Sequence, residues 1–273
     1  MRVALQDPAY PAYLDTSIIH HGNKDIIYLP CLPENNFFPD LSLAKEADVI
    51  FICSPNNPTG SVLSYKELQE IVSFAKAFQK IIIFDSAYSF YVSNGHPKSI
   101  YEIEGAKEVA IEIGSFSKIA GFSGVRLGWT VVPSELRYAT SEPVRADWMR
   151  LITTFYNGAS YISQHGGLAA LSDKGLEEIR AQVSFYLTNA KMLRRAFLDL
   201  GYEAYGGINS PYLWVRAAGK TSWQAFEELL EKAHIITTPG VGFGPAGEGF
   251  LRISGFAHRS SIEEAIARLN SKK

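Results

Sequence analysis

Short apolar runs alternate with longer segments of helical spacing through the first half of the sequence. The run from Ala47 to Cys53 is apolar enough to be buried on both faces, which is typical of a central strand in a parallel sheet. Ser64 and Glu67 have the spacing of a capping box and predict a helix that continues to about Gln79. Strands that alternate with helices predict a mostly parallel sheet covered on both sides. The expected strands are Arg2–Gln6, Asp25–Leu29, Ala47–Cys53, Lys80–Asp85, Val109–Ile113 and Leu127–Val132.

The pattern becomes helical from Ser134 onward. A polar break at Asn157–Ser160 precedes a helix over Tyr161–Leu171, and a long helix with apolar residues at helical spacing follows over Gly175–Leu200. We therefore predict an α/β fold with a large domain over residues 1–175 and a small C-terminal α/β domain over residues 176–273. The small domain is expected to contain strands at Tyr212–Val215, Ile235–Thr238 and Phe250–Ser254, and helices at Ser222–Lys232 and Ser261–Asn270.

Composition narrows the class of protein. The 273 residues are 47% hydrophobic and 20% charged with a net charge of −2, which is ordinary for a soluble globular chain. Near-neutral charge argues against broad binding to nucleic acid or to a membrane surface. The two cysteines suggest no disulfide framework, and the first residues lack the apolar core of a signal peptide, so we expect a reducing, cytoplasmic setting.

Two local patterns resemble binding motifs but do not support them. His20 and His21 are adjacent, with no cysteine or aspartate at ligand spacing nearby, so we expect surface residues and no metal site. The stretch Gly242–Gly247 has the glycine spacing of a dinucleotide-binding fingerprint. That fingerprint opens a helix, whereas this stretch leads through Pro245 into another expected strand, so we expect a mobile loop over a site.

Polar side chains gather where the expected strands end, and in open parallel sheets ligands bind at that edge. Lys118 follows the strand at Val109–Ile113, Arg126 stands eight positions further on, and Asp85 ends another strand. Lys118 and Asp85 also have ordinary structural explanations. Lys118 can be a solvated lysine in a turn, and Asp85 can be a carboxylate that caps a helix. The tyrosines of the expected loop Asp7–Tyr13 can equally be aromatic residues packed on the core.

Together these residues are far more specific than any one of them, because they match what a pyridine aldehyde phosphate needs. A carboxylate keeps the ring nitrogen protonated, a lysine forms an imine with the aldehyde, and hydroxyls with an arginine hold the phosphate. The expected partners are Asp85 for the ring nitrogen, Asn57 and Tyr88 for the ring oxygen, Tyr10 for the ring face, Lys118 for the imine, and Ser115, Ser117 and Arg126 for the phosphate.

The same motifs resemble the class I/II pyridoxal-phosphate aminotransferases of fold type I, and most closely the LL-diaminopimelate branch of that family. The resemblance runs from Arg2 nearly to the C-terminus. It rests on Asp7-Pro-Ala-Tyr-Pro-Ala-Tyr13, Cys53-Ser-Pro-Asn-Asn-Pro-Thr-Gly60, Phe84-Asp-Ser-Ala-Tyr88, Ser115-Phe-Ser-Lys-Ile-Ala-Gly-Phe122 with Arg126, Phe155-Tyr-Asn-Gly-Ala-Ser160 and Thr238-Pro-Gly-Val-Gly-Phe-Gly-Pro-Ala-Gly-Glu-Gly-Phe250.

The resemblance implies roles and partners that the pattern alone does not. Arg252 would clamp the α-carboxylate of an amino acid or 2-oxo acid substrate, with Tyr10 and Asn57 beside it. Asn157 would reach across a homodimer to the distal end of the substrate, although a helix cap explains an asparagine there almost as well. The implied reaction moves an amino group between glutamate/2-oxoglutarate and diaminopimelate/tetrahydrodipicolinate.

Members of this family have a long region before the strand at Arg2–Gln6, which includes an arm and part of the phosphate cradle. We therefore expect this chain to correspond to about the C-terminal two-thirds of such an enzyme, and to bind cofactor weakly by itself. Two other readings stay open: another aminotransferase or a carbon–sulfur lyase on the same fold, and a non-catalytic remnant.

Overall fold

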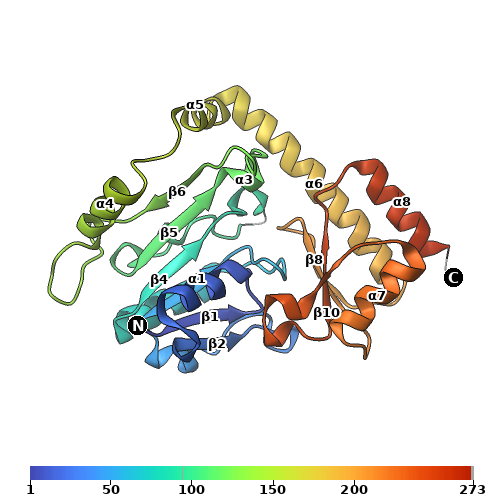
Figure 1. Cartoon of the computed structure of the whole chain (residues 1–273), viewed down its shortest axis with the longest axis horizontal. Coiled ribbons are helices and arrows are strands. Elements are labelled where there is room, and N and C mark those ends of the chain that lie inside the picture. Colours follow the sequence, from blue (N-terminus) through green and yellow to red (C-terminus); the bar gives the residue numbers. More distant parts are fainter. Residues whose placement is uncertain (94, 272–273) are drawn as a thin grey trace.

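The computed structural model describes residues 1–93 and 95–271 and contains two sheets joined by a long helix (Figure 1). The larger sheet has the order β2-β1-β3-β4-β5-β6. Its first five members are parallel, and β6 runs antiparallel beside β5. The mostly parallel α/β fold is confirmed. The strands are β1 (Val3–Asp7), β2 (Ile26–Pro30), β3 (Val49–Cys53), β4 (Ile81–Asp85), β5 (Ala110–Ser115) and β6 (Gly128–Val131).

Both faces of this sheet are covered, as its continuous apolar runs predict. In β3, Ile50 and Ile52 lie in the core cluster that includes the apolar side of helix α2 (Tyr65–Phe78). Phe51 and Cys53 point to the opposite face, where the ring of Tyr13 stacks on Phe51 at 5.1 Å between centroids. Alternate residues of a strand point to opposite faces, so one buried strand supplies two cores.

Helix α2 begins with the capping box that the sequence predicts. The hydroxyl of Ser64 accepts from the backbone N–H of Glu67, and the carboxylate of Glu67 accepts from the backbone N–H of Ser64 at 2.7 Å. These bonds satisfy donors that the first turn of a helix otherwise leaves unpaired.

The loop predicted over Asp7–Tyr13 is wrong in its second half, because helix α1 (Pro11–His21) begins there. Proline suits the first position of a helix, since its missing N–H has no partner there and its φ angle is already helical. Pro11 therefore starts a helix. The turn between β1 and α1 is limited to Pro8–Tyr10.

The helical region predicted from Ser134 starts later than expected. Residues 134–143 form turns with a bridge between Arg137 and Pro143, and the short helix α3 (Phe116–Ile119) was not predicted. The remaining helices of this region are α4 (Val144–Phe155), α5 (Tyr161–Ala170) and α6 (Asp173–Asp199).

Helix α6 connects the two halves of the molecule (Figure 1). Its Ile179 and Val183 pack with Phe116 of α3, whereas Leu193 and Phe197 pack against the second sheet. The predicted division between residues 175 and 176 falls in the first turn of this helix and stays a prediction.

The smaller sheet is antiparallel, with the order β7-β8-β10-β9. Strand β7 was not predicted, and the strand expected at Ile235–Thr238 shrinks to two residues because β10 pairs there only with Thr238 and Pro239. Apolar side chains from α6, α7 and α8 cover one face. The elements are β7 (Ala204–Gly206), β8 (Tyr212–Arg216), β9 (Thr238–Pro239), β10 (Phe250–Ser254), α7 (Ser222–Ala233) and α8 (Arg259–Asn270).

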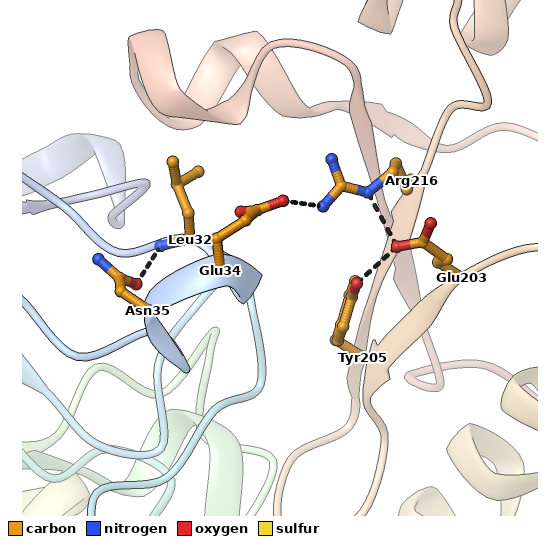
Figure 2. Close-up of polar contacts among 6 residues, drawn as sticks. All are labelled: Leu32, Glu34, Asn35, Glu203, Tyr205 and Arg216. Carbon is orange, nitrogen blue, oxygen red and sulfur yellow. Dashed lines mark hydrogen bonds and ion pairs between the residues drawn. The ribbon is translucent and has the colours of Figure 1, made fainter.

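The opposite face of the smaller sheet meets the larger one. Trp214 of β8 is fully buried in a cluster with Phe243, Phe250 and two residues that follow β2, Cys31 and Phe37. Two positions along β8, Arg216 bonds Glu34 at 2.6 Å and Glu203 at 2.9 Å, and Tyr205 donates to Glu203, as Figure 2 shows. Tyr212, Trp214 and Arg216 lie two positions apart in β8, so their side chains point to the same face of the sheet. On this face Trp214 forms the apolar joint between the two sheets, and Arg216 forms the ion pair beside it.

Candidate active site

A cavity of about 430 Å³ lies at the C-terminal edge of the parallel strands, between the two sheets. Every predicted site residue except Asn157 lines it. The lining residues are Tyr10, Tyr13, Cys53, Asn57, Asp85, Ala87, Tyr88, Ser115, Ser117, Lys118, Ser123, Arg126, Tyr212 and Arg252.

Asp85 ends β4, and two donors fix its carboxylate. The phenol of Tyr13 donates to Oδ2 at 2.5 Å, and the backbone N–H of Ala87 donates to Oδ1 at 2.8 Å. Burial raises the pKa of Asp85 above its usual value, and the two hydrogen bonds oppose that rise. A carboxylate held in this way at a cavity wall is suited to face a cation.

Lys118 lies directly after β5, in α3, and is only partly exposed. The phenol of Tyr91 holds the backbone of this residue by donating to its carbonyl at 2.9 Å. Burial lowers the pKa of Lys118, and the charges of Arg252 and Arg126 lower it further. Its amine therefore gives up a proton more readily than a solvated lysine does, which favours the functional reading over the structural one.

Ser115, Ser117 and Arg126 form one side of the cavity near Lys118. The hydroxyl of Ser115 accepts from the backbone N–H of Ser117 at 3.1 Å. Arg126 is exposed, has a φ of 63° and donates from Nη1 to the carbonyl of Ser123 at 2.6 Å. Two hydroxyls and a guanidinium at one wall can bind a phosphate.

Arg252 enters the cavity from β10 of the smaller sheet. Its Nη1 donates to Oδ1 of Asn57 at 2.9 Å, and its Cζ lies 4.5 Å from the ring centroid of Tyr212 and 4.8 Å from that of Phe243. The ion pairs among the described residues do not include Arg252, so pairing with a nearby acid does not explain it. Its charge can therefore bind an external carboxylate.

Tyr88 and Tyr10 take different positions on the cavity wall. Tyr88 is buried, and its hydroxyl lies 3.0 Å from that of Tyr212. Burial and the neighbouring Tyr212 raise the pKa of Tyr88, so its phenol keeps its proton and can donate. Tyr10 is 46% exposed, with its ring edge-on to that of Tyr13 at 5.7 Å, and can offer a face to a flat ligand.

Asn157 does not line this cavity. It follows α4 with a φ of 52°, and its backbone N–H donates to the carbonyl of Ile152 at 3.0 Å. Asparagine tolerates this left-handed conformation, so the geometry matches a helix stop. A reach into the site of a second chain stays a prediction.

Five lining residues were not predicted from the sequence, and the side chains of two of them, Tyr13 and Tyr212, hydrogen-bond side chains of predicted site residues. The sequence pattern predicts a loop at Tyr13, although its spacing from Tyr10 also matches one face of a helical turn. The sequence pattern predicts only a strand at Tyr212, and the contact of Tyr212 with Tyr88 spans 124 positions of the chain. No local pattern reveals such a pairing.

The described residues add two negative findings. None of their helices combines the length and the apolar character needed to cross a membrane. Nor does the described part of the chain bring together three or more histidine, cysteine or acidic side chains in a group that could hold a metal ion.

Comparison with known proteins places this cavity in context. Residues 1–269 match the family model for class I and II aminotransferases. The chain is 53% identical to the LL-diaminopimelate aminotransferase of Protochlamydia amoebophila over 98% of its length, and 51% identical to the chloroplastic LL-diaminopimelate aminotransferase of Arabidopsis thaliana over 97%. The solved L,L-diaminopimelate aminotransferase of Chlamydomonas reinhardtii superposes on 99% of the chain with a TM-score of 0.95 and 53% identity.

The matched proteins are longer than this chain. It spans 68% of the Protochlamydia protein, 60% of the Arabidopsis protein and 69% of the solved Chlamydomonas chain.

Proposed function

The chain belongs to the class I and II aminotransferase family, and from that premise we propose that it acts as an LL-diaminopimelate aminotransferase with pyridoxal 5′-phosphate as cofactor. The proposed reaction moves an amino group between glutamate/2-oxoglutarate and diaminopimelate/tetrahydrodipicolinate. The observation that carries the proposal is the meeting of Lys118, Asp85 and Arg252 at one cavity, from α3, β4 and β10. The names of relatives more than half identical in sequence support the choice of substrate.

The donor set of the cavity fits this cofactor. Burial alone makes the charged form of Asp85 costly, so a protonated ring nitrogen is the kind of partner that would stabilise it. Ser115, Ser117 and Arg126 would hold the phosphate, and Asn57 with Tyr88 would hold the ring oxygen. When bound, the ring accepts electrons from the α-carbon of the substrate.

The protein groups around that carbon have distinct tasks. Arg252 binds the α-carboxylate with its planar guanidinium, and Asn57 fixes the orientation of that guanidinium. Lys118, whose pKa is lowered, takes and returns a proton at the α-carbon. Tyr10, which lines the cavity and is half exposed, would offer its ring face to the cofactor ring.

Replacement of Lys118 by alanine tests the proposal. Lys118→Ala removes both the covalent attachment and the proton carrier, so the rate of amino transfer from LL-diaminopimelate to 2-oxoglutarate should fall by several powers of ten. Lys191→Ala, at an exposed position of α6, is the matched control and should retain the wild-type rate. A Lys118→Ala rate within about tenfold of wild type would contradict the assignment. A panel of other amino acids and 2-oxo acids in the same assay identifies the substrate.

We also propose that the enzyme works as a homodimer. Helices α4 and α5 expose large apolar side chains, among them Phe155 at 74%, Tyr161 at 74% and Ile162 at 83%. Exposed apolar groups at this density are typical of an interaction surface.

A further inference from the structure

The glycine-rich stretch Gly242–Gly247 folds around the carboxylate of Asp7. It forms parts of two short 3₁₀ turns, Gly240–Phe243 and Pro245–Gly247. The backbone N–H of Ala246 donates to both carboxylate oxygens of Asp7, at 3.1 Å each. Gly244 has a φ of +129°, and a Cβ atom there would stand 2.2 Å from Oδ1 of Asp7. The glycine spacing that resembles a dinucleotide fingerprint thus makes room for a carboxylate of the same chain.

An ionised carboxylate is energetically unfavourable at position 7 because it is buried. Asp7 is 3% exposed at the end of β1, and burial raises its pKa to about 6. The titratable groups that it faces from neighbouring segments are Tyr28 of β2 and Cys31, whose own pKa values are raised by burial and, to a smaller extent, by the charge of Asp7. Neither is a cation, so a neutral side chain would be less costly here unless the carboxylate has a task.

The turn that Asp7 holds also contacts Arg252. Phe243 immediately precedes Gly244, and its ring lies 4.8 Å from Cζ of Arg252. The carbonyl of Phe243 accepts from the backbone N–H of Ala9 at 2.9 Å, beside Tyr10. On the other side of the turn, Thr238 pairs with Arg252 in the sheet. A shift of the turn therefore moves one of the two rings that contact the guanidinium.

We propose that Asp7 is a positioning residue: its carboxylate seats the Gly242–Gly247 turn so that Phe243 orients Arg252 for a substrate carboxylate. The role of Arg252 rests on the proposed function. The seat itself, which is the contact between the carboxylate of Asp7 and the Gly242–Gly247 turn, does not. The second polar link between the sheets, Arg216 with Glu34 in Figure 2, is largely exposed and contributes little rigidity by comparison.

The first experiment measures amide hydrogen exchange of the turn in the full chain, above pH 7, where Asp7 is ionised. Asp7→Ala removes the acceptor and Gly244→Ala adds a clashing methyl group, so both should speed exchange at Ala246 by roughly tenfold or more. Gly242→Ala, whose Cβ would meet no atom within 4 Å, and Glu34→Gln are the controls and should leave exchange unchanged.

A double variant tests the contact itself. With alanine at position 7, the methyl group of Gly244→Ala has room, so its effect should shrink to the cost of its backbone conformation alone. Additive effects of the two substitutions, or unchanged exchange in Asp7→Ala, would overturn the seat.

The second experiment measures the affinity of the cofactor-loaded enzyme for 2-oxoglutarate by calorimetry, together with kcat and KM. Asp7→Ala should weaken 2-oxoglutarate binding and raise KM for both the amino donor and the acceptor by roughly five- to tenfold, with kcat changed less. Faster exchange of the turn with unchanged affinity would overturn the link to Arg252. Wild-type enzyme that binds no 2-oxoglutarate would refute the proposed function and with it the role of Arg252, while the exchange data still decide whether the seat exists.

Discussion

At the scale of single residues, the site depends on the surroundings of three side chains. Asp85 is buried but hydrogen-bonded, Lys118 is partly buried beside two arginines, and Arg252 lies against two aromatic rings. The sequence predicted Asp85 and Lys118 because the C-terminal ends of parallel strands meet at one edge, whereas Arg252 of β10 was expected only from the family resemblance. It could not predict Tyr13 as the partner of Asp85, since that contact joins residues 72 positions apart.

Tyr13→Phe tests that contact. Removing the phenol takes a donor from the carboxylate of Asp85, so its pKa rises further and its ionised form becomes harder to keep. We expect about tenfold weaker binding of pyridoxal phosphate, measured by equilibrium dialysis, from the loss of a hydrogen bond to a charged group. Tyr28→Phe, a phenylalanine substitution outside the cavity, serves as the control. Equal affinity of Tyr13→Phe and wild type would show that Tyr13 does not support the carboxylate.

Asp7 gives the molecule a predictable dependence on pH. Its pKa is raised in the folded chain from 3.8 to about 6 by burial, so the folded chain holds this proton more tightly than the unfolded chain. Proton binding by Asp7 therefore stabilises the folded chain. This contribution to the free energy of unfolding is complete below about pH 4 and is lost as the pH rises through 6.

Asp7→Asn removes this titration. Wild type should therefore lose free energy of unfolding relative to the variant between about pH 4 and pH 6.5, by on the order of 1–2 kcal/mol after allowance for solvent screening. Urea denaturation at a series of pH values measures the difference. Wild-type stability that stays constant relative to the variant, or that rises relative to it with pH, would show that burial does not dominate the pKa of this carboxyl group.

At the scale of elements, the buried strands and the capped helix α2 could be predicted because their patterns are local. Helix α1 could not, since Pro11 was read as a break although it occupies the first helical position. The two-residue strand β9 exists only through its pairing with β10, and β7 is held beside β8, so neither has a periodic pattern of its own.

The pairing of β5 with β6 carries a strict steric requirement at Gly114. This glycine lies opposite Trp129, and a Cβ atom there would stand 2.2 Å from Cζ2 of the indole. Gly114→Ala should displace the indole and destabilise the chain by about 1–3 kcal/mol, which lowers the melting temperature by several degrees. Gly124→Ala, where a Cβ meets no atom within 4 Å, is the control for thermal unfolding. A melting temperature of Gly114→Ala equal to that of the control would contradict the packing.

At the scale of the whole molecule, the sequence predicted two units but not how they face each other. The joint depends on alternate residues of β8, and the side that they take is fixed only when the smaller sheet has packed its other face against α6, α7 and α8. The position of the cavity between the two sheets is therefore a property of tertiary packing, not of any motif.

Self-association is the prediction that belongs to this scale. Ile162→Asp introduces a charge into the exposed apolar surface of α5 and should shift the chain from dimer to monomer, by at least tenfold in the dissociation constant. Ile236→Asp is the matched control, because Ile236 is 79% exposed and lies before β9, away from α4 and α5. Sedimentation velocity over a concentration series measures both. An unchanged dimer in Ile162→Asp would place the interface elsewhere.

The burial of Trp214 makes the joint between the sheets optically visible. Its indole is stacked on Phe250 at 5.1 Å and meets Phe243 edge-on at 6.0 Å, and among the described residues its buried Nε1 has no hydrogen-bond partner. An indole in such dry, apolar surroundings fluoresces at shorter wavelength than one in water. Because Phe243 belongs to the turn that Asp7 seats, a displacement of that turn should change the emission of Trp214.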